Sequence, residues 1–329
     1  MHTRISGFVC AALLYFTGSK EHNIQLRARA VKRGCTLNEY GLFKGKKRLD
    51  ADSEEALYKN LGLSYVPPEL REGRGEVELA EQDKIPQLID SKDITGVLHV
   101  HSTWSDGTAS IQDMAEKARR LGYKWMGLSD HSKAASYAHG LDDGRLKKQM
   151  KEVAALNATW KDFRILHGME VDILPDGTLD LSDELSAKLD FVIGSIHSRF
   201  DMTETEMTER VCKVMASPHF DVLGHPTGRL LLRREGFKID LEKVIQAAKK
   251  EGKVVELNAN PHRLDLDDAH ARRAKELGVK MSIDPDAHSV SGLEDVEFGL
   301  RTARRAGLQA GDVLNSLPAE KVKARFAGR

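Results

Sequence analysis

Two histidines and an aspartate near residue 100 have the types and spacing of metal ligands. The stretch reads Leu98-His99-Val100-His101, and Asp106 follows five residues later beside a glycine. Because apolar residues alternate with the histidines, the pattern predicts a strand whose two imidazoles project from the same face. Imidazole and carboxylate groups are ligands of zinc, manganese and iron. The stretch therefore predicts the beginning of a metal site.

The same residue types recur along the chain, nearly always at the end of a short apolar run. The further candidates are Asp130-His131, Glu170, His197, His225 and the pair Asp286 and His288. A single His-x-His pair is weak support for metal binding, because many histidines have other roles. Six histidines and three acids at equivalent points of repeated units are much stronger support. Such a set is what a hydrolase with several metal ions requires.

The elements that would position these residues alternate between strands and helices. Strands are predicted over 97–101, 125–129, 164–170, 191–197, 221–225, 254–258 and 280–283, and helices over 110–121, 240–252 and 268–277. This alternation predicts parallel strands, either in an open sheet or in a barrel. Six of the seven strands end in a candidate ligand. Since a barrel gathers its strand ends in one ring, whereas an open sheet spreads them along a line, we expect a barrel.

Composition indicates a soluble globular protein. The chain has 329 residues, 40% of them hydrophobic and 30% charged, with a formal net charge of zero. No global basic field therefore points to nucleic acid. The three cysteines form no C-x-x-C pair, and no apolar run reaches the length of about 18–20 residues that spans a bilayer. We expect a cytoplasmic protein with no membrane contact and no obligatory protein partner.

The composition changes along the chain and suggests two parts. Residues 1–49 have a local charge of +8, from ten Lys and Arg against two Glu, which is compatible with phosphate contacts or with a solvated face. Residues 1–65 are expected to form a small α+β subdomain. Residues 66–92 are acidic, contain prolines and have few large apolar side chains, so we expect a linker. The repeated strand and helix pattern occupies 93–329.

With these motifs in hand, residues from about 95 to 317 resemble the polymerase and histidinol phosphatase (PHP) superfamily of metal-dependent phosphoesterases. The resemblance implies a distorted (β/α)7 TIM-like barrel that holds three divalent metal ions, Zn²⁺ or Mn²⁺. It assigns His99, His101, Glu170 and Asp286 to the first ion and His197 and His225, with a bridging Glu170, to the second. Asp106, His131 and His288 would hold the third. Glu170 and Asp286 are thus expected at the catalytic centre, and Arg229, just past a ligand strand, either grips phosphate oxygens or is a surface arginine.

The N-terminal part resembles the thumb subdomain of family X DNA polymerases. The resemblance rests on Tyr15, Phe16, Gly18, Ser19, Asn23 and Arg27, followed by Leu37-Asn38-Glu39-Tyr40. In that family the matching side chains approach the nascent base pair and the template, so these residues are expected to contact DNA. The alternative is a small packing module whose aromatic residues are core.

Together the two resemblances predict a metal-dependent phosphoesterase acting on DNA 3′ ends in gapped or recessed duplexes. The expected activity is a 3′–5′ exonuclease, with 3′-phosphatase or abasic-site cleavage as further options. The alternatives are a small-molecule phosphatase of the histidinol-phosphatase type and a non-catalytic DNA-binding module. No palm-type carboxylates precede the thumb-like segment, so primer extension is not expected of this chain.

Overall fold

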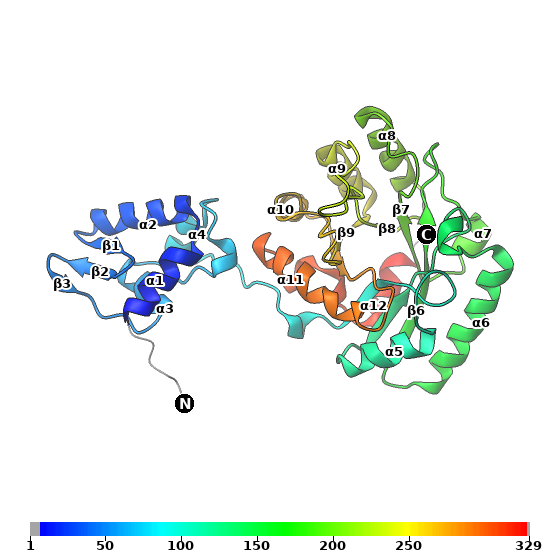
Figure 1. The fold of residues 1–329 in the computed structure, drawn as a ribbon, viewed down its shortest axis with the longest axis horizontal. Coiled ribbons are helices and arrows are strands. Elements are labelled where there is room, and N and C mark those ends of the chain that lie inside the picture. Colours follow the sequence, from blue (N-terminus) through cyan, green and yellow to red (C-terminus); the bar gives the residue numbers. More distant parts are fainter. Residues whose placement is uncertain (1–6, 328–329) are drawn as a thin grey trace. The chain divides into compact units, whose positions relative to one another are not determined.

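The computed structural model describes residues 7–327, which form two compact units divided between Gln87 and Leu88 (Figure 1). The N-terminal unit contains four helices, two of them short, and a small antiparallel sheet. Its elements are α1 (Gly7–Thr17), α2 (Lys20–Lys32), β1 (Thr36–Asn38), β2 (Gly41–Lys44), β3 (Lys47–Arg48), α3 (Glu54–Asn60), a 3₁₀ turn (Pro68–Leu70) and α4 (Glu76–Glu81). The sheet order is β1-β2-β3. Leu14, Leu26, Leu42 and Leu57 are buried between the helices and the sheet. The expected α+β subdomain is therefore present.

The segment expected to be a linker is folded over most of its length. Arg71 is fully buried, and its Nη1 donates to Glu54 Oε1 of α3 at 2.7 Å. Glu76 of α4 is also buried and lies 2.6 Å from Nδ1 of the buried His22. The acidic composition and the prolines predicted a solvated segment, but the charged side chains of Arg71 and Glu76 are paired in the interior instead. The structure thus differs from the expectation, because residues 66–81 belong to the N-terminal unit.

The second unit contains seven parallel strands in the order β10-β9-β8-β7-β6-β5-β4. They are β4 (Gly96–Val100), β5 (Trp125–Leu128), β6 (Arg164–Asp172), β7 (Phe191–Ser195), β8 (Val222–Leu223), β9 (Val254–Asn258) and β10 (Met281–Asp284). The first and last strands also meet, since His101 N donates to Ala287 O at 2.9 Å and Ala287 N donates to His99 O at 3.1 Å. These bonds close the sheet into a barrel. The predicted TIM-like barrel of seven strands is confirmed, and its two-residue β8 shows that it is distorted.

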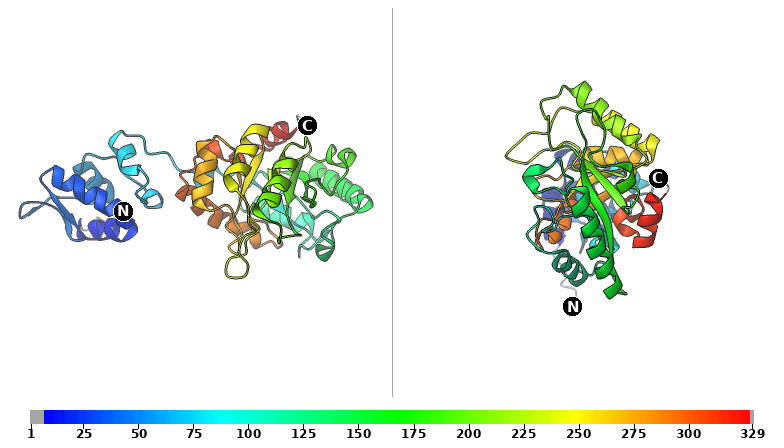
Figure 2. Two further views of the ribbon diagram at one scale, coloured as in Figure 1. Left: turned by 90° about the horizontal axis from the view of Figure 1, so that it is seen from above. Right: turned by 90° about the vertical axis from the view of Figure 1, so that its right-hand side faces the viewer.

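Helices surround the barrel, as Figures 1 and 2 show for this unit. They are α5 (Ile111–Arg120), α6 (Asp143–Thr159), α7 (Asp183–Ser186), α8 (Glu204–Met215), α9 (Leu241–Glu251), α10 (Asp268–Glu276), α11 (Val296–Arg305) and α12 (Ala319–Phe326). The three helices predicted from apolar spacing correspond to α5, α9 and α10. Their starts follow from side-chain caps, since Ser110, Asp240 and Asp267 each accept a backbone N–H of the first turn.

The barrel interior is filled below the candidate site by a compact apolar cluster. Phe191 occupies the space beside Gly127 and Gly168, where an added Cβ would lie within 3 Å of its ring. Leu98, Leu166 and Ile193 belong to the same cluster. On β6, Leu166 and Glu170 are four residues apart and share one face of the strand. The buried carboxylate therefore projects inward above an apolar floor.

A bulge in β4 modifies the simple alternation expected around the two histidines. The pairing with β5 changes register between Val97 and Val100, and His99 has a positive φ of 56°. As a result Leu98 joins the interior cluster, and yet His99 and His101 both reach the same site, with ring centroids 5.3 Å apart. The two imidazoles converge as predicted, but through a bulge and not through a regular strand.

No helix within residues 7–327 combines the length and the apolar character that crossing a bilayer requires. A cytoplasmic location remains a prediction from composition.

We expect Glu54→Ala to destabilise the N-terminal unit by about 3 kcal/mol, because it leaves the buried Arg71 charge without its carboxylate. Glu55→Ala, one residue further on the exposed side of α3, is the matched control and should cost less than about 0.5 kcal/mol. Hydrogen exchange measured by mass spectrometry over residues 54–81 would report the loss of protection. Equal protection in the two variants would contradict a folded 66–81 segment.

Candidate metal centre

Glu170 lies at the centre of the candidate site. It is on the buried β6, and its side chain is 1% exposed. Its carboxylate oxygens are close to five imidazoles, at 3.2 Å from His99 Nε2, 3.6 Å from His101 Nε2, 3.0 Å from His131 Nδ1, 3.4 Å from His197 Nε2 and 3.0 Å from His225 Nε2. These five histidines come from the ends of four different strands. The barrel thus brings together residues up to 126 positions apart in the chain, from His99 to His225.

Asp286 forms a second acidic point beside Glu170. Its Oδ1 lies 3.5 Å from His99 Nε2, 3.4 Å from His101 Nε2 and 3.6 Å from His288 Nδ1. Its Oδ2 accepts hydrogen bonds from Asn258 Nδ2 at 3.2 Å and from Arg263 Nε at 3.1 Å. One oxygen therefore faces the imidazoles, while the other is held in place.

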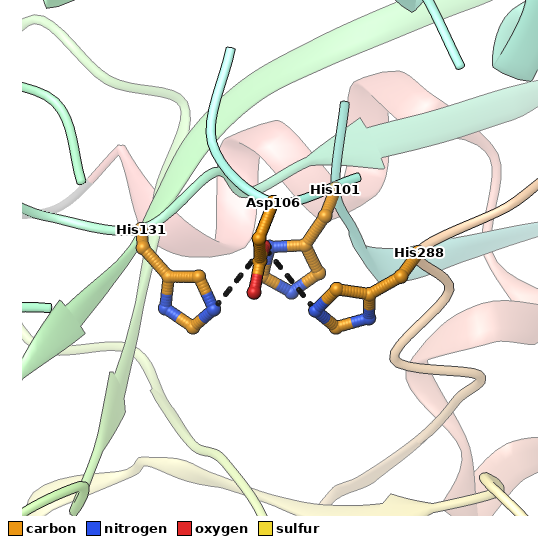
Figure 3. Close-up of side chains that lie close together, drawn as sticks. All are labelled: His101, Asp106, His131 and His288. Atoms are coloured by element: carbon orange, nitrogen blue, oxygen red, sulfur yellow. Dashed lines mark ion pairs between the residues drawn. The ribbon is translucent and has the colours of Figure 1, made fainter. Parts of the chain in front are cut away.

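Asp106 is the third acid, and it lies at the more exposed edge of the site. Figure 3 shows His101, His131 and His288 gathered around it. Its Oδ1 is 3.7 Å from His131 Nε2 and 3.4 Å from His288 Nε2. The side chains of Asp106 and His288 are 30% and 36% exposed, whereas His101 is fully buried. The edge of the site is accordingly open to solvent.

The nine predicted ligands form one continuous cluster. Their nitrogen and oxygen atoms form four groups, and within each group the atoms lie within 4.8 Å of one another. Four residues, His99, His101, His131 and Glu170, each belong to two of these groups and so connect them. Both nitrogens of His101 and the Oε2 atom of Glu170 are buried without a hydrogen bond of good geometry in the described part of the chain. Unpaired buried polar atoms are costly, and divalent cations would satisfy them. The donor set therefore fits metal ions.

Two buried acids outside the predicted set orient the ligand imidazoles. Glu256 of β9 contacts His99 Nδ1 through one oxygen and accepts the His225 backbone N–H through the other at 2.6 Å. Asp172, at the end of β6, is 2.6 Å from His197 Nδ1. A carboxylate on the far nitrogen fixes the tautomer and the ring orientation of a ligand histidine. Sequence reasoning did not single out either acid, although a glutamate inside Val254-Val255-Glu256-Leu257 was a usable signal.

Asp130 supports the site from below and does not join the cluster. It is fully buried and accepts hydrogen bonds from Ser102 N at 2.8 Å, from Ser102 Oγ at 2.6 Å and from Gln149 Nε2 at 2.6 Å. Ser105 Oγ also donates to it. These bonds hold residues 102–105, which connect His101 to Asp106. Asp130 therefore positions the loop that carries the Asp106 ligand.

The electrostatics of the cluster depend on the same contacts. Burial lowers the pKa of His101 to about 3, and the neighbouring His288 and His131 act in the same direction. Burial also lowers the pKa of His197, but Glu170 and Asp172 outweigh it and raise that pKa to about 9. Burial raises the pKa of Glu256 to about 7 against the opposing effect of His99. His197 would thus lose a proton when it binds a metal ion, so metal binding there should release protons, whereas His101 is already neutral near pH 7.

Arg229 is half-buried and contacts the backbone of a neighbouring loop. Its Nε donates to Arg263 O at 2.8 Å, and its Nη2 donates to Leu264 O. Arg263 contacts the cluster through Asp286, and its Nη1 is buried without a hydrogen bond to any residue that the structure describes. Arg229 thus holds the backbone of residues 263 and 264 in place. Arg263 was not predicted as a site residue, because it lies in a loop with no ligand motif.

The six expected DNA-contacting residues lie around the junction of α1 and α2. Phe16 is 77% exposed, Arg27 lies over the Tyr15 ring at 5.2 Å, and Asn23 Nδ2 donates to Tyr15 O at 3.0 Å. Ser19 caps α2 by accepting the His22 N–H, and an added Cβ at Gly18 would approach Leu14 O to 3.3 Å. Ser19 and Gly18 therefore determine the backbone conformation of the junction, while the side chains of Phe16 and Arg27 are exposed to solvent.

Comparison with known proteins agrees with the fold and the ligand pattern. Residues 98–260 match the PHP domain, and residues 12–72 match the DNA polymerase beta thumb. A protein named "Probable phosphatase" from Thermoanaerobacter sp. (strain X514) is 31% identical over 231 residues, which cover 66% of this chain and 89% of that protein. The chain belongs to the PHP superfamily.

The thumb match extends to a longer relative. The protein named "DNA polymerase/3′-5′ exonuclease PolX" from Bacillus subtilis (strain 168) is 45% identical over 314 residues, or 95% of this chain. The chain spans 55% of that relative's length. The crystal structure of a candidate histidinol phosphatase from Listeria monocytogenes superposes with a TM-score of 0.50 at 17% identity. It covers 60% of this chain and 97% of that one, and supports the barrel fold.

We expect Glu256→Ala to weaken metal binding by about 10- to 100-fold, because His99 loses the partner that orients it. The measurement is competition with a chromogenic chelator for zinc, and Glu276→Ala on the outer helix α10 is the control. Unchanged zinc affinity in Glu256→Ala would exclude a positioning role for this acid.

Proposed function

We propose that this chain is a metal-dependent phosphoesterase that removes nucleotides from the 3′ ends of DNA. The single observation that carries the proposal is the convergence of nine candidate ligands at one mouth of the barrel, where seven side chains gather around the Glu170 and Asp286 carboxylates. The thumb match in the same chain, and the name of the B. subtilis relative, support DNA as the substrate. Abasic-site cleavage and 3′-phosphate removal would use the same centre.

The proposed centre holds three divalent ions, Zn²⁺ or Mn²⁺. His99, His101, Glu170 and Asp286 would hold one, and His197 and His225 with the second Glu170 contact would hold another. Asp106, His131 and His288 would hold the third, at the exposed edge. Such ions supply Lewis-acid stabilisation of phosphate charge and lower the pKa of a water molecule.

The protein's own residues would hold and orient this site. The Glu170 carboxylate is proposed to bridge two ions, because its two oxygens face different imidazoles. Asn258 and Arg263 fix the Asp286 carboxylate, so that its free oxygen points at the cluster. The remaining buried Nη1 of Arg263 is available to a phosphate oxygen, the contact first expected of Arg229.

DNA would be held in part by the thumb residues. Phe16 offers an exposed ring for stacking on a base, and Arg27 offers a cation beside Tyr15. Tyr15, Gly18, Ser19 and Asn23 would form the adjoining helix junction. A thumb of this kind has a clear use with a polynucleotide and none with a small phosphate ester.

The second candidate is a small-molecule phosphatase. The Thermoanaerobacter relative named "Probable phosphatase" favours it, since the match covers 89% of that protein and only 66% of this chain. Both candidates use the same metal cluster, so the substrate has to distinguish them.

We expect about three zinc or manganese ions per chain in protein purified without chelator, and a loss of at least tenfold in phosphoester hydrolysis in Asp286→Ala. Elemental analysis and initial rates measure the two quantities. The control is Asp201→Ala, whose exposed carboxylate lies outside the cluster. A stoichiometry below one ion per chain, or near-normal activity of Asp286→Ala, would contradict the proposed centre.

With manganese present, we expect a 3′-recessed duplex to release nucleotides with a kcat/KM at least tenfold above that for histidinol phosphate, because a polynucleotide gains thumb contacts that a small ester lacks. Gel analysis of the DNA and phosphate release from the ester give the two rates. A tenfold preference for histidinol phosphate would support the small-molecule phosphatase instead.

A further inference from the structure

The loop that follows the ligand His225 has an apolar tip that the fold leaves uncovered. Leu232 is fully solvent-exposed, at 107% relative exposure, and has a left-handed backbone with φ of 63°. The preceding Leu231 is 37% exposed. A branched apolar residue is unfavourable both in that conformation and in water. Neither core packing nor turn chemistry therefore explains a leucine here.

The tip is held firmly by the base of its loop. Leu230 and Arg234 exchange both backbone hydrogen bonds at 2.8 Å, which makes a closed turn. Leu231 N donates to His262 O at 2.6 Å, and Arg234 Nη2 donates to Gly228 O at 2.6 Å. In Figure 2 the yellow-green chain between β8 and α9 projects from the barrel unit as a narrow loop. Leu232 is thus presented on a braced projection.

This projection stands at the rim of the metal centre. The loop begins three residues after His225, and it is braced on residues 262–264, whose Arg263 contacts Asp286. Arg234 lies over the Phe200 ring at 4.4 Å, and the nearby Arg263 charge, together with burial, lowers the pKa of its guanidinium. The exposed tip therefore lies within a few residues of the groups that line the site.

The surroundings of the tip are cationic. Arg233 and Arg234 follow Leu232 directly, and Glu235 is the one acid between residues 229 and 235. At the loop base, Arg229 and Arg263 lie near the carboxylates of Asp265 and Asp286, so the excess of positive charge is at the tip itself. An apolar side chain among arginines matches a nucleic-acid end, which offers phosphate charge and the flat face of a base pair.

The burial of the cluster suggests what an apolar side chain at the tip of this loop would do. His99, His101 and Glu170 are at most 1% exposed, whereas Asp106 and His288 at the edge are 30% and 36% exposed, so the innermost candidate ligands are the least accessible to a substrate. An unpaired 3′ nucleotide is narrower than a paired one, because the paired nucleotide carries its complement with it. Opening the terminal base pair would therefore help the last phosphodiester to approach the buried ligands.

We propose that Leu232 is a wedge that separates the terminal base pair of a DNA duplex and directs the 3′ strand to the metal centre. The inference rests on the proposed exonuclease function and names the part of the substrate that this loop contacts. Apolar side chains are known to enter base steps and to unstack them, and flanking arginines would hold the phosphates on either side. Leu232 is in this view a specificity-determining residue and is not itself a catalytic one.

The first experiment compares 3′-end hydrolysis of a blunt duplex with that of the same strand unpaired, both with manganese. We expect Leu232→Ala to lower the ratio of the duplex rate to the single-strand rate by about tenfold, because the alanine is too short to enter the base step. Leu121→Ala, an equally simple change at an exposed leucine on the C-terminal end of α5, should leave the ratio unchanged. An unchanged ratio in Leu232→Ala, or an equal loss on both substrates, would overturn the wedge.

The second experiment does not need hydrolysis. A duplex carrying 2-aminopurine at its 3′-terminal position becomes brighter when that base leaves the stack. With metals removed by chelator, wild-type protein should increase the fluorescence at saturation, and Leu232→Ala should not. A rise with both proteins would overturn the proposal. Hydrolysis of neither DNA by wild type, together with a Leu232-dependent fluorescence rise, would instead reject the exonuclease and retain the wedge.

Discussion

The barrel depends on one energetic constraint, which is the burial of the Glu170 carboxylate among five imidazoles. A carboxylate removed from water costs several kcal/mol unless it is paired, and a cluster of buried imidazoles costs more if they are all protonated. Further acids lie beside four of the five rings, with Glu256 and Asp286 at His99, Asp286 at His101, Asp106 at His131 and Asp172 at His197. Cations held by these groups would balance the charge, so the cluster is understandable as a metal site and not as a core.

Backbone strain is concentrated at the same place. Three of the nine candidate ligands have positive φ, namely His99 at 56°, His225 at 24° and Asp286 at 50°. Each such residue costs on the order of 1 kcal/mol or more, and strain of this kind persists where the surroundings impose it. Here one of the bonds that close the barrel, from Ala287 N to His99 O, involves the strained His99, and the strained Asp286 directly precedes Ala287. The strained His225 is held separately, because its backbone N–H donates to Glu256. The positive φ at these residues lets their side chains point toward the cluster at the strand ends. In a regular strand, every second side chain would point away from it.

Much of the fold could be predicted, because parallel strands and amphipathic helices have local signals. The nine candidate ligands could also be selected from the sequence, since nearly all of them follow an apolar run. The partners of these ligands were harder to find. Glu256 lies inside a strand, Asp172 lies two residues beyond the predicted end of its strand, and Arg263 is in a loop, so only the closed barrel shows that they meet. The linker expectation failed for the same reason: composition does not reveal that Arg71 and Glu76 find buried partners at Glu54 and His22.

The division between a buried floor and an exposed rim explains how related proteins can differ in substrate. The floor is set by strand ends, and its ligands are fixed by buried acids that tolerate little change. The rim is made by loops such as 228–237 and by Tyr137, whose side chain is 65% exposed and whose ring lies 6.2 Å from that of His197. Loops can change length and sequence without disturbing the barrel hydrogen bonds. Substrate choice between a small ester and a DNA end would therefore reside in the rim, and the arginines and the exposed leucine of this chain fit the polymer substrate proposed above.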